Sequence, residues 1–133
     1  MPFKVNKVTG DFNCNQNLLT SLEDCPKEVG GSFHCSGNQL TDLKGCPKDV
    51  GGDFDCSGNE IKSLENCPIE IGGNLNCSKN KLTKLDTVAN VSGYIACYDN
   101  EIDPNNDGFN GWCGDKIFYD VGDYVREKIY LNN

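Results

Sequence analysis

The stretch VGGSFHCSGNQLTDLKGCPKD, residues 29–49, is followed at once by VGGDFDCSGNEIKSLENCPIE, residues 50–70. The second segment keeps the glycine pair, both cysteines and every large apolar position of the first. Such near-copies indicate a repeat protein, because one unit of this length cannot bury its apolar face without a neighbour. The repeat therefore predicts a stack of coils around one continuous core.

The repeat extends in both directions with a period of 21 residues, and a fifth unit has lost one residue. Each of the four full units opens with a β-branched residue and then carries an aromatic or aliphatic residue, a cysteine, an asparagine and two aliphatic residues. The fifth unit keeps this order but has only Ile102 after its asparagine. A second cysteine, followed by proline, closes three of the units. The first cysteine and asparagine columns are Cys14, Cys35, Cys56, Cys77 and Cys97, and Asn17, Asn38, Asn59, Asn80 and Asn100; the second cysteine column is Cys25, Cys46 and Cys67.

One unit can be read residue by residue. Phe33 and Cys35 alternate with polar residues, which predicts a short strand with one buried face. The chain then turns at Gly37-Asn38, and Pro47 forbids helix on the return path. Gly30-Gly31 make the bend into the next strand, where a side chain would crowd the stack. Stacked strands of this kind form a parallel sheet.

The phrase F-x-C-x-x-N-x-L-x-x-L resembles the leucine-rich repeat pattern over residues 8–102, and its short units resemble the bacterial and phage branch of that family. The resemblance implies an α/β-type right-handed solenoid with a parallel sheet on its concave face. It also implies that the asparagine column bonds backbone groups inside the turn. The chain departs from the family in its cysteines and in its glycine pairs.

The cysteines have three readings: core packing, disulfides or a zinc site. The start of the chain has no apolar segment of signal-peptide length, so we expect a cytoplasmic protein with reduced thiols. The total of nine is odd, and no C-x-x-C motif occurs. We therefore expect buried core columns, since free cysteine packs as a small hydrophobe.

The expected domain organisation is a single domain. Residues 1–7 form an N-terminal cap strand, residues 8–102 form five repeats, and residues 103–133 form a C-terminal cap. An apolar period near 3.6 predicts a helix over 116–131 in that cap. Little other helix is expected.

The net charge of −8 is concentrated near the C-terminus. Residues 99–123 contain seven acidic residues and one lysine, a net of −6. A surface of this sign disfavours direct binding to nucleic acid or to an anionic membrane. An acidic inhibitor that mimics DNA remains an alternative function, because the acidic residues cluster in one segment of the sequence.

Two motifs near the C-terminus suggest chemistry. Asp103, Asn105 and Asp107 precede Gly108 as in a calcium loop, but Gly114 stands where a bidentate glutamate belongs. The alternative is a turn rich in Asx residues. Cys113-Gly114-Asp115 matches a C-x-D motif of bacterial ubiquitin ligases, but the remaining chain is too short for that domain. We expect no enzyme activity and no cofactor, with calcium as the open alternative.

The outward face of the predicted strands varies between units while the core columns do not. This face ends in two tyrosines, which are favoured interface anchors. We expect a protein-binding surface formed by Asp11, Asn13, His34, Asp53, Asp55, Asn74, Asn76, Tyr94 and Tyr98.

The functional hypothesis is a non-enzymatic protein-binding repeat module, as a monomer or weak homodimer. Similar cysteine-bearing repeats occur in small proteins of tailed phages. That resemblance implies a phage accessory protein that binds or inhibits a host protein in the host-cell cytoplasm. The alternatives are the DNA mimic and a calcium-binding surface or secreted module.

Overall fold

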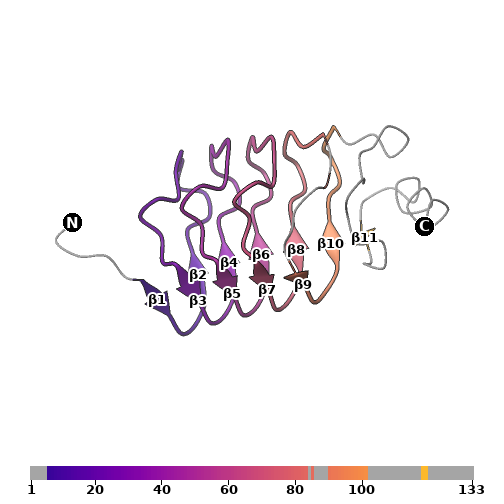
Figure 1. The fold of residues 1–133 in the computed structure, drawn as a ribbon. Coiled ribbons are helices and arrows are strands. Elements are labelled where there is room, and N and C mark those ends of the chain that lie inside the picture. The colour runs from indigo at the N-terminus through magenta and orange to yellow at the C-terminus, as the bar shows by residue number, and fades with distance from the viewer. Residues whose placement is uncertain (1–5, 84, 86–89, 102–117, 120–133) are drawn as a thin grey trace.

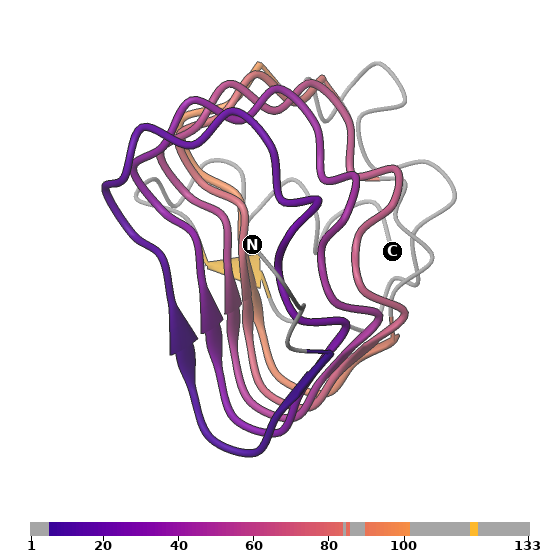
Figure 2. The same ribbon diagram turned by 90° about the vertical axis from the view of Figure 1, so that its left-hand side faces the viewer.

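The computed structural model describes residues 6–83, 85, 90–101 and 118–119, and its described part is a parallel β-solenoid. Successive coils stack side by side, so that equivalent strands line up along the solenoid axis (Figures 1 and 2). Each coil contributes one strand to each of two parallel sheets. Sheet A contains β1 (Lys7–Val8), β3 (Glu28–Val29), β5 (Asp49–Val50), β7 (Glu70–Ile71) and β9 (Asn90–Val91). Sheet B contains β2 (Phe12–Asn13), β4 (Phe33–His34), β6 (Phe54–Asp55), β8 (Leu75–Asn76), β10 (Ile95–Ala96) and β11 (Phe118–Tyr119).

The strand register reproduces the sequence period. Phe12 pairs with Phe33, and Phe33 pairs with Phe54, each 21 residues further along. In the last step of the repeat, Leu75 pairs with Ile95, and the offset falls to 20. The repeat and its shortened fifth unit are therefore confirmed as a structural period. The family analogy led us to expect only the sheet that contains the phenylalanine column, and sheet A is an addition.

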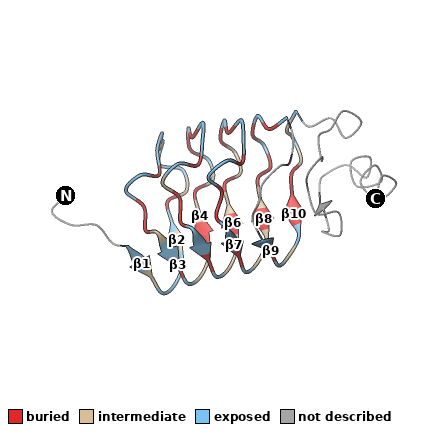
Figure 3. Cartoon of the chain, in the orientation of Figure 1, coloured by how far each residue is buried: buried red, intermediate tan, exposed pale blue. Residues whose placement is uncertain are grey.

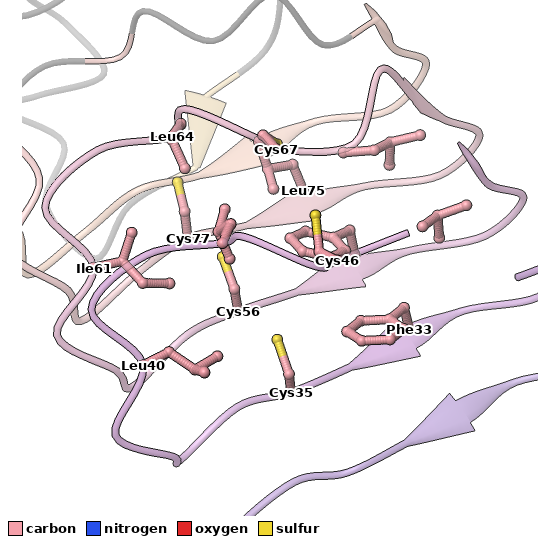
Figure 4. Packing of buried hydrophobic residues seen from close by; sticks show 14 of the residues in the cluster. Phe33, Cys35, Leu40, Cys46, Cys56, Ile61, Leu64, Cys67, Leu75 and Cys77 are labelled. Carbon is pink, nitrogen blue, oxygen red and sulfur yellow. The ribbon is translucent and has the colours of Figure 1, made fainter. Parts of the chain in front are cut away.

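The repeat columns form the core inside the stacked coils (Figures 3 and 4). Leu40, Ile61 and Leu82 are fully buried, and so are the equivalent positions of the second aliphatic column. The rings of Phe12 and Phe33 stack at 5.4 Å between centroids, and Phe33 continues the stack onto Phe54 at 5.6 Å. This stacking follows from the register, because a parallel ladder places identical side chains one strand spacing apart.

The expected α/β character is wrong for the described residues, which contain no helix. The predicted helix over 116–131 is also corrected at Phe118–Tyr119. These residues form β11, which pairs in parallel with β10, and extended backbone replaces helix there. The 3.6-residue apolar period was a weak guide because a short edge strand needs only two residues to join the sheet. The rest of that range and the N-terminal cap strand over 1–7, apart from Asn6 and Lys7, lie outside the described residues.

The bends have a strict steric requirement. A Cβ atom on Gly51 would meet the carbonyl oxygen of Gly30, and a Cβ atom on Gly72 would meet that of Gly51. The next glycine column is constrained by side chains, since a Cβ atom on Gly73 would meet Oδ1 of Asp53. The glycine pair thus allows neighbouring coils to approach each other at the bend between the two sheets.

Candidate binding face

The residues predicted to bind a partner lie along sheet B and its two flanks. The strand register aligns Asn13, His34, Asp55 and Asn76 in one row on the outward face. We call these four residues the middle row. All but Asn13 are half-buried, and Asn13, in the first coil, is exposed. Sheet B therefore brings the predicted middle-row residues together, one per coil.

A second row of predicted residues has a structural role that the sequence did not reveal. Oδ1 of Asp11 accepts the backbone N–H of Ser32 at 2.7 Å, and Oγ of Ser32 accepts that of Asp53 at 2.9 Å. Oδ1 of Asp53 accepts the backbone N–H of Asn74 at 2.8 Å, and Oδ1 of Asn74 accepts that of Tyr94 at 3.0 Å. We call this row the bend ladder. Each side chain satisfies a backbone donor of the next coil, so these residues connect coils as well as face solvent.

Three members of the middle row also bond locally. Oδ1 of Asn13 accepts the backbone N–H of Asn15 at 2.9 Å. Oδ1 of Asp55 accepts from both the backbone N–H and the hydroxyl of Ser57, at 3.0 and 2.7 Å. Oδ1 of Asn76 accepts the backbone N–H of Ser78 at 3.1 Å. These Asx turns orient the side chains before any ligand is present. A face of this kind loses little side-chain entropy on binding.

The two predicted tyrosines lie at the same end of the face. Tyr94 is among the three exposed large apolar residues of the described chain, and Tyr98 is half-buried. Tyr98 extends the column that contains Ser57 and Ser78. Ser78 is fully buried, and its hydroxyl has no hydrogen-bond partner in the described structure. At this end of the face, the flank that contains Ser78 and Tyr98 is thus enclosed, whereas the flank that contains Tyr94 is exposed.

The predicted asparagine column is confirmed in four coils out of five. Oδ1 of Asn59 accepts the N–H of Leu40 in the preceding coil at 3.0 Å, and Nδ2 donates to the carbonyl of Cys35 in that coil at 3.1 Å. Asn38, Asn80 and Asn100 make equivalent bonds. Asn17 does not, because it lies in the first described coil and its exposed side chain has no described coil to reach back to.

The eight described cysteines are buried and none is in a disulfide, which confirms their prediction as core columns. Burial raises the pKa of the Cys35, Cys56 and Cys77 thiols well above the ordinary value. Burial also raises the pKa of Cys46. These thiols are therefore protonated and unreactive at neutral pH.

A groove that sequence reasoning missed lies on a different side of the coils. It has a volume of about 470 Å³, and it is lined by charged side chains of both signs and by threonine side chains. The signal was present in the sequence, because the polar residues on either side of Leu40, Ile61 and Leu82 must face outward. The lining residues are Thr41, Glu60, Lys62, Lys81, Thr83 and Glu101.

The remaining candidates lie outside the described residues: the calcium-loop residues Asp103, Asn105 and Asp107, Cys113, and most of the acidic segment. Within the described ranges, no three histidine, cysteine or acidic side chains are grouped to hold a metal ion. Nor does that part of the chain contain an apolar helix of membrane-spanning length.

Comparison with known proteins does not assign the chain to a family. No protein-family model, curated protein or solved structure matches the chain. The functional argument therefore depends on the geometry of the faces.

Proposed function

We propose that the chain is a non-enzymatic binding module that recognises another protein through the outward face of sheet B. The observation that carries the proposal is the alignment of the middle row beside Tyr94 and Tyr98. Hydrogen-bonding groups recur there once per coil and end at an aromatic pair. Tyrosine combines apolar area with a hydroxyl and is enriched among residues that dominate binding energy.

The bonding of the face supports a protein ligand. Local Asx turns fix Asp55 and Asn76, and the bend ladder fixes the residues beside them. The backbone beneath is held in a parallel sheet. Such a surface suits a partner that presents its own fixed donors and acceptors over roughly 800 Å². The family resemblance adds that related solenoids bind proteins through their strand face, and it supplies the phage context of the proposal.

The test compares three immobilised full-length chains for capture from a bacterial lysate. His34 and Tyr94 contribute to the face, and the described structure shows no hydrogen bond to the His34 ring. The double variant His34→Ala/Tyr94→Ala therefore removes binding groups without breaking the bend ladder. Asp49→Asn is the matched control, because Asp49 is exposed on sheet A.

We expect a protein that the wild type and Asp49→Asn retain equally and that the double variant loses. The affinity measured with that purified protein should fall by at least about 30-fold, which corresponds to about 2 kcal/mol. Equal retention by all three chains would refute binding through this face. Loss of binding on raising salt, with no effect of the double variant, would instead indicate the acidic DNA mimic.

A further inference from the structure

The polar groove follows one buried column of the core. Leu40, Ile61 and Leu82 form this column and are fully buried, and the residues on either side of each are exposed. Backbone bonds join successive coils here, because the Lys81 N–H donates to the carbonyl of Ile61 and the Glu101 N–H to that of Leu82, both at 2.8 Å. The lining side chains therefore lie in two walls, with neighbouring members about 4.8 Å apart from coil to coil. The leading wall is Glu60, Lys81 and Glu101, and the trailing wall is Thr41, Lys62 and Thr83.

The two walls place charges of both signs at defined positions. Lys62 and Lys81 come from opposite walls in neighbouring coils. Glu60 lies across the groove from Lys62 in the same coil, and Glu101 lies one coil beyond Lys81 on the leading wall. A point midway between the two lysines is thus one and a half coils from Glu101, or about 7 Å along the solenoid axis.

These four charged groups do not neutralise one another. No ion pair in the described chain includes any of them, although Glu60, Lys81 and Glu101 alternate in sign in successive coils. The coil spacing by itself does not prevent such pairing, because Nζ of Lys7 lies 3.8 Å from Oε2 of Glu28 in the next coil. The charges that line the groove are therefore free to bind a ligand.

The arrangement of the charges distinguishes between classes of ligand. A simple anion between the two lysines is attracted by both, but Glu60 and Glu101 repel it. A simple cation beside either glutamate is repelled by Lys62 and Lys81 in the same way. A ligand with one group of each sign is attracted at both ends, so the groove favours a zwitterion.

We propose that the groove binds a short linear peptide with free termini. The peptide carboxylate accepts from Nζ of Lys62 and of Lys81, and the terminal ammonium donates to the carboxylate of Glu101. Thr83 lies in the coil of Lys81, between these two ends, where its hydroxyl can bond an amide group of the peptide. At about 3.4 Å for each extended residue, two to three residues bridge the two ends. The groove volume of about 470 Å³ is within the usual range of small-ligand sites.

The exposure of the groove limits the affinity. All six lining residues are exposed, and exposed ion pairs are weak. We therefore expect a dissociation constant on the order of millimolar for a tripeptide. None of the lining residues lies in a strand of sheet B, so this site is independent of the face that we propose for protein binding.

Nuclear magnetic resonance titration of the isotopically labelled full-length chain tests the site. The probe is triglycine, which has two charged termini and no other charge. N-acetyl-triglycine keeps only the carboxylate, and triglycine amide keeps only the ammonium. We expect triglycine to shift the backbone amide signals of Lys62, Lys81 and Glu101 saturably, and each singly charged probe to bind about threefold to fivefold more weakly. The absence of a saturable shift, or equal binding of triglycine and a singly charged probe, would overturn the proposal.

Two variants assign the ends of the peptide. Lys81→Gln should remove most of the advantage of triglycine over triglycine amide, because the carboxylate loses one of its two donors. Glu101→Gln should remove the advantage of triglycine over N-acetyl-triglycine. Lys48→Gln is the matched control, because Lys48 is exposed outside the groove, and its affinities should equal those of the wild type. The spectrum of each free variant reports whether it is folded. A preference that survives in either groove variant would contradict this placement of the peptide and overturn the proposal.

Discussion

The side-chain amide of Asn59 spans two coils: Oδ1 accepts the N–H of Leu40 at 3.0 Å in the coil before it, while Nδ2 donates to carbonyls of both coils. Asn59 is buried, so water cannot replace these bonds. Leu40 is fully buried, so water cannot reach its backbone N–H either. One side chain therefore satisfies several backbone groups that the turn would leave unpaired.

Asn59→Ala should lower the free energy of unfolding by about 3 kcal/mol or more, because it leaves buried backbone donors and acceptors unsatisfied at about 1–3 kcal/mol each. Urea unfolding measures the change. The matched control is Asn17→Ala, in the same column, where the side chain is exposed and joins no ladder. We expect that control to stay within about 0.5 kcal/mol of wild type. Equal losses in the two variants would contradict the inter-coil role.

Gly73→Ala should destabilise the stack because the new methyl group meets Oδ1 of Asp53 and lies 2.9 Å from the backbone carbon of Gly52. Overpacking of this kind costs about 1–3 kcal/mol. Gly10 occupies the equivalent position in the first coil, where a Cβ atom meets nothing within 4 Å. In thermal unfolding, the melting temperature of Gly10→Ala should equal or exceed that of the wild type. If both variants lost stability equally, the steric explanation would fail.

Lys79→Gly should stabilise the turn. Lys79 has φ of 56°, and the equivalent residues Gly37 and Gly58 have φ of 66°. A left-handed residue with a side chain costs about 1–2 kcal/mol, and the added flexibility of glycine offsets about half of it. We expect a gain of about 0.5 kcal/mol in urea unfolding. Lys81→Gly, two residues along and outside the left-handed region, should instead lose about 0.5–1 kcal/mol.

The buried thiols predict a loss of stability in alkali. Burial holds the pKa of Cys35, Cys56 and Cys77 far above the unfolded value, so the folded state keeps three protons that the unfolded chain releases above about pH 8.5. Their contribution is complete below that pH and is lost as the pH rises above it. Between pH 7 and 9.5 the three groups should remove about 4 kcal/mol.

Urea unfolding at the two pH values, with a phosphine reductant present, measures this loss. Cys56→Ala should reduce the pH-dependent part by about one quarter, because the Cys46 thiol, whose pKa burial also raises, contributes as the other three do. This holds whatever the effect of the variant on stability at pH 7. A pH dependence that the variant leaves unchanged would show that other groups cause it.

The sequence was sufficient for the features that repeat. The Phe33 and Cys35 columns follow from period-two alternation within a period of 21, and the stacking of coils follows from the inability of one unit to bury them. The turn at Gly37-Asn38 and the bend at Gly30-Gly31 could be placed because each needs a residue type that few others can replace. The helix over 116–131 was wrong at Phe118–Tyr119 because a short apolar segment carries both periods, and pairing with β10 decided between them.

The candidate binding face, too, could be predicted only in part from the sequence. The residues on the outward face could be predicted from alternation, and the register of sheet B aligns those of the middle row. The sequence did not show which of its polar side chains bond within their own coil and which bond the next coil. Asp53 and Asp55 are the same residue type on the same face, yet Asp53 accepts from Asn74 in the next coil and Asp55 from Ser57 in its own.

By itself, the sequence determined that the chain forms a stack of coils, where each coil turns, and which residues form the dry interior. It could do so because these features depend on local residue type repeated at a fixed interval. Only the tertiary structure decided that each coil contributes strands to two sheets and that Asp53 connects coils. These features depend on the cross-section of a coil and on the direction in which each side chain leans, and both are set by packing between residues that lie far apart in the chain.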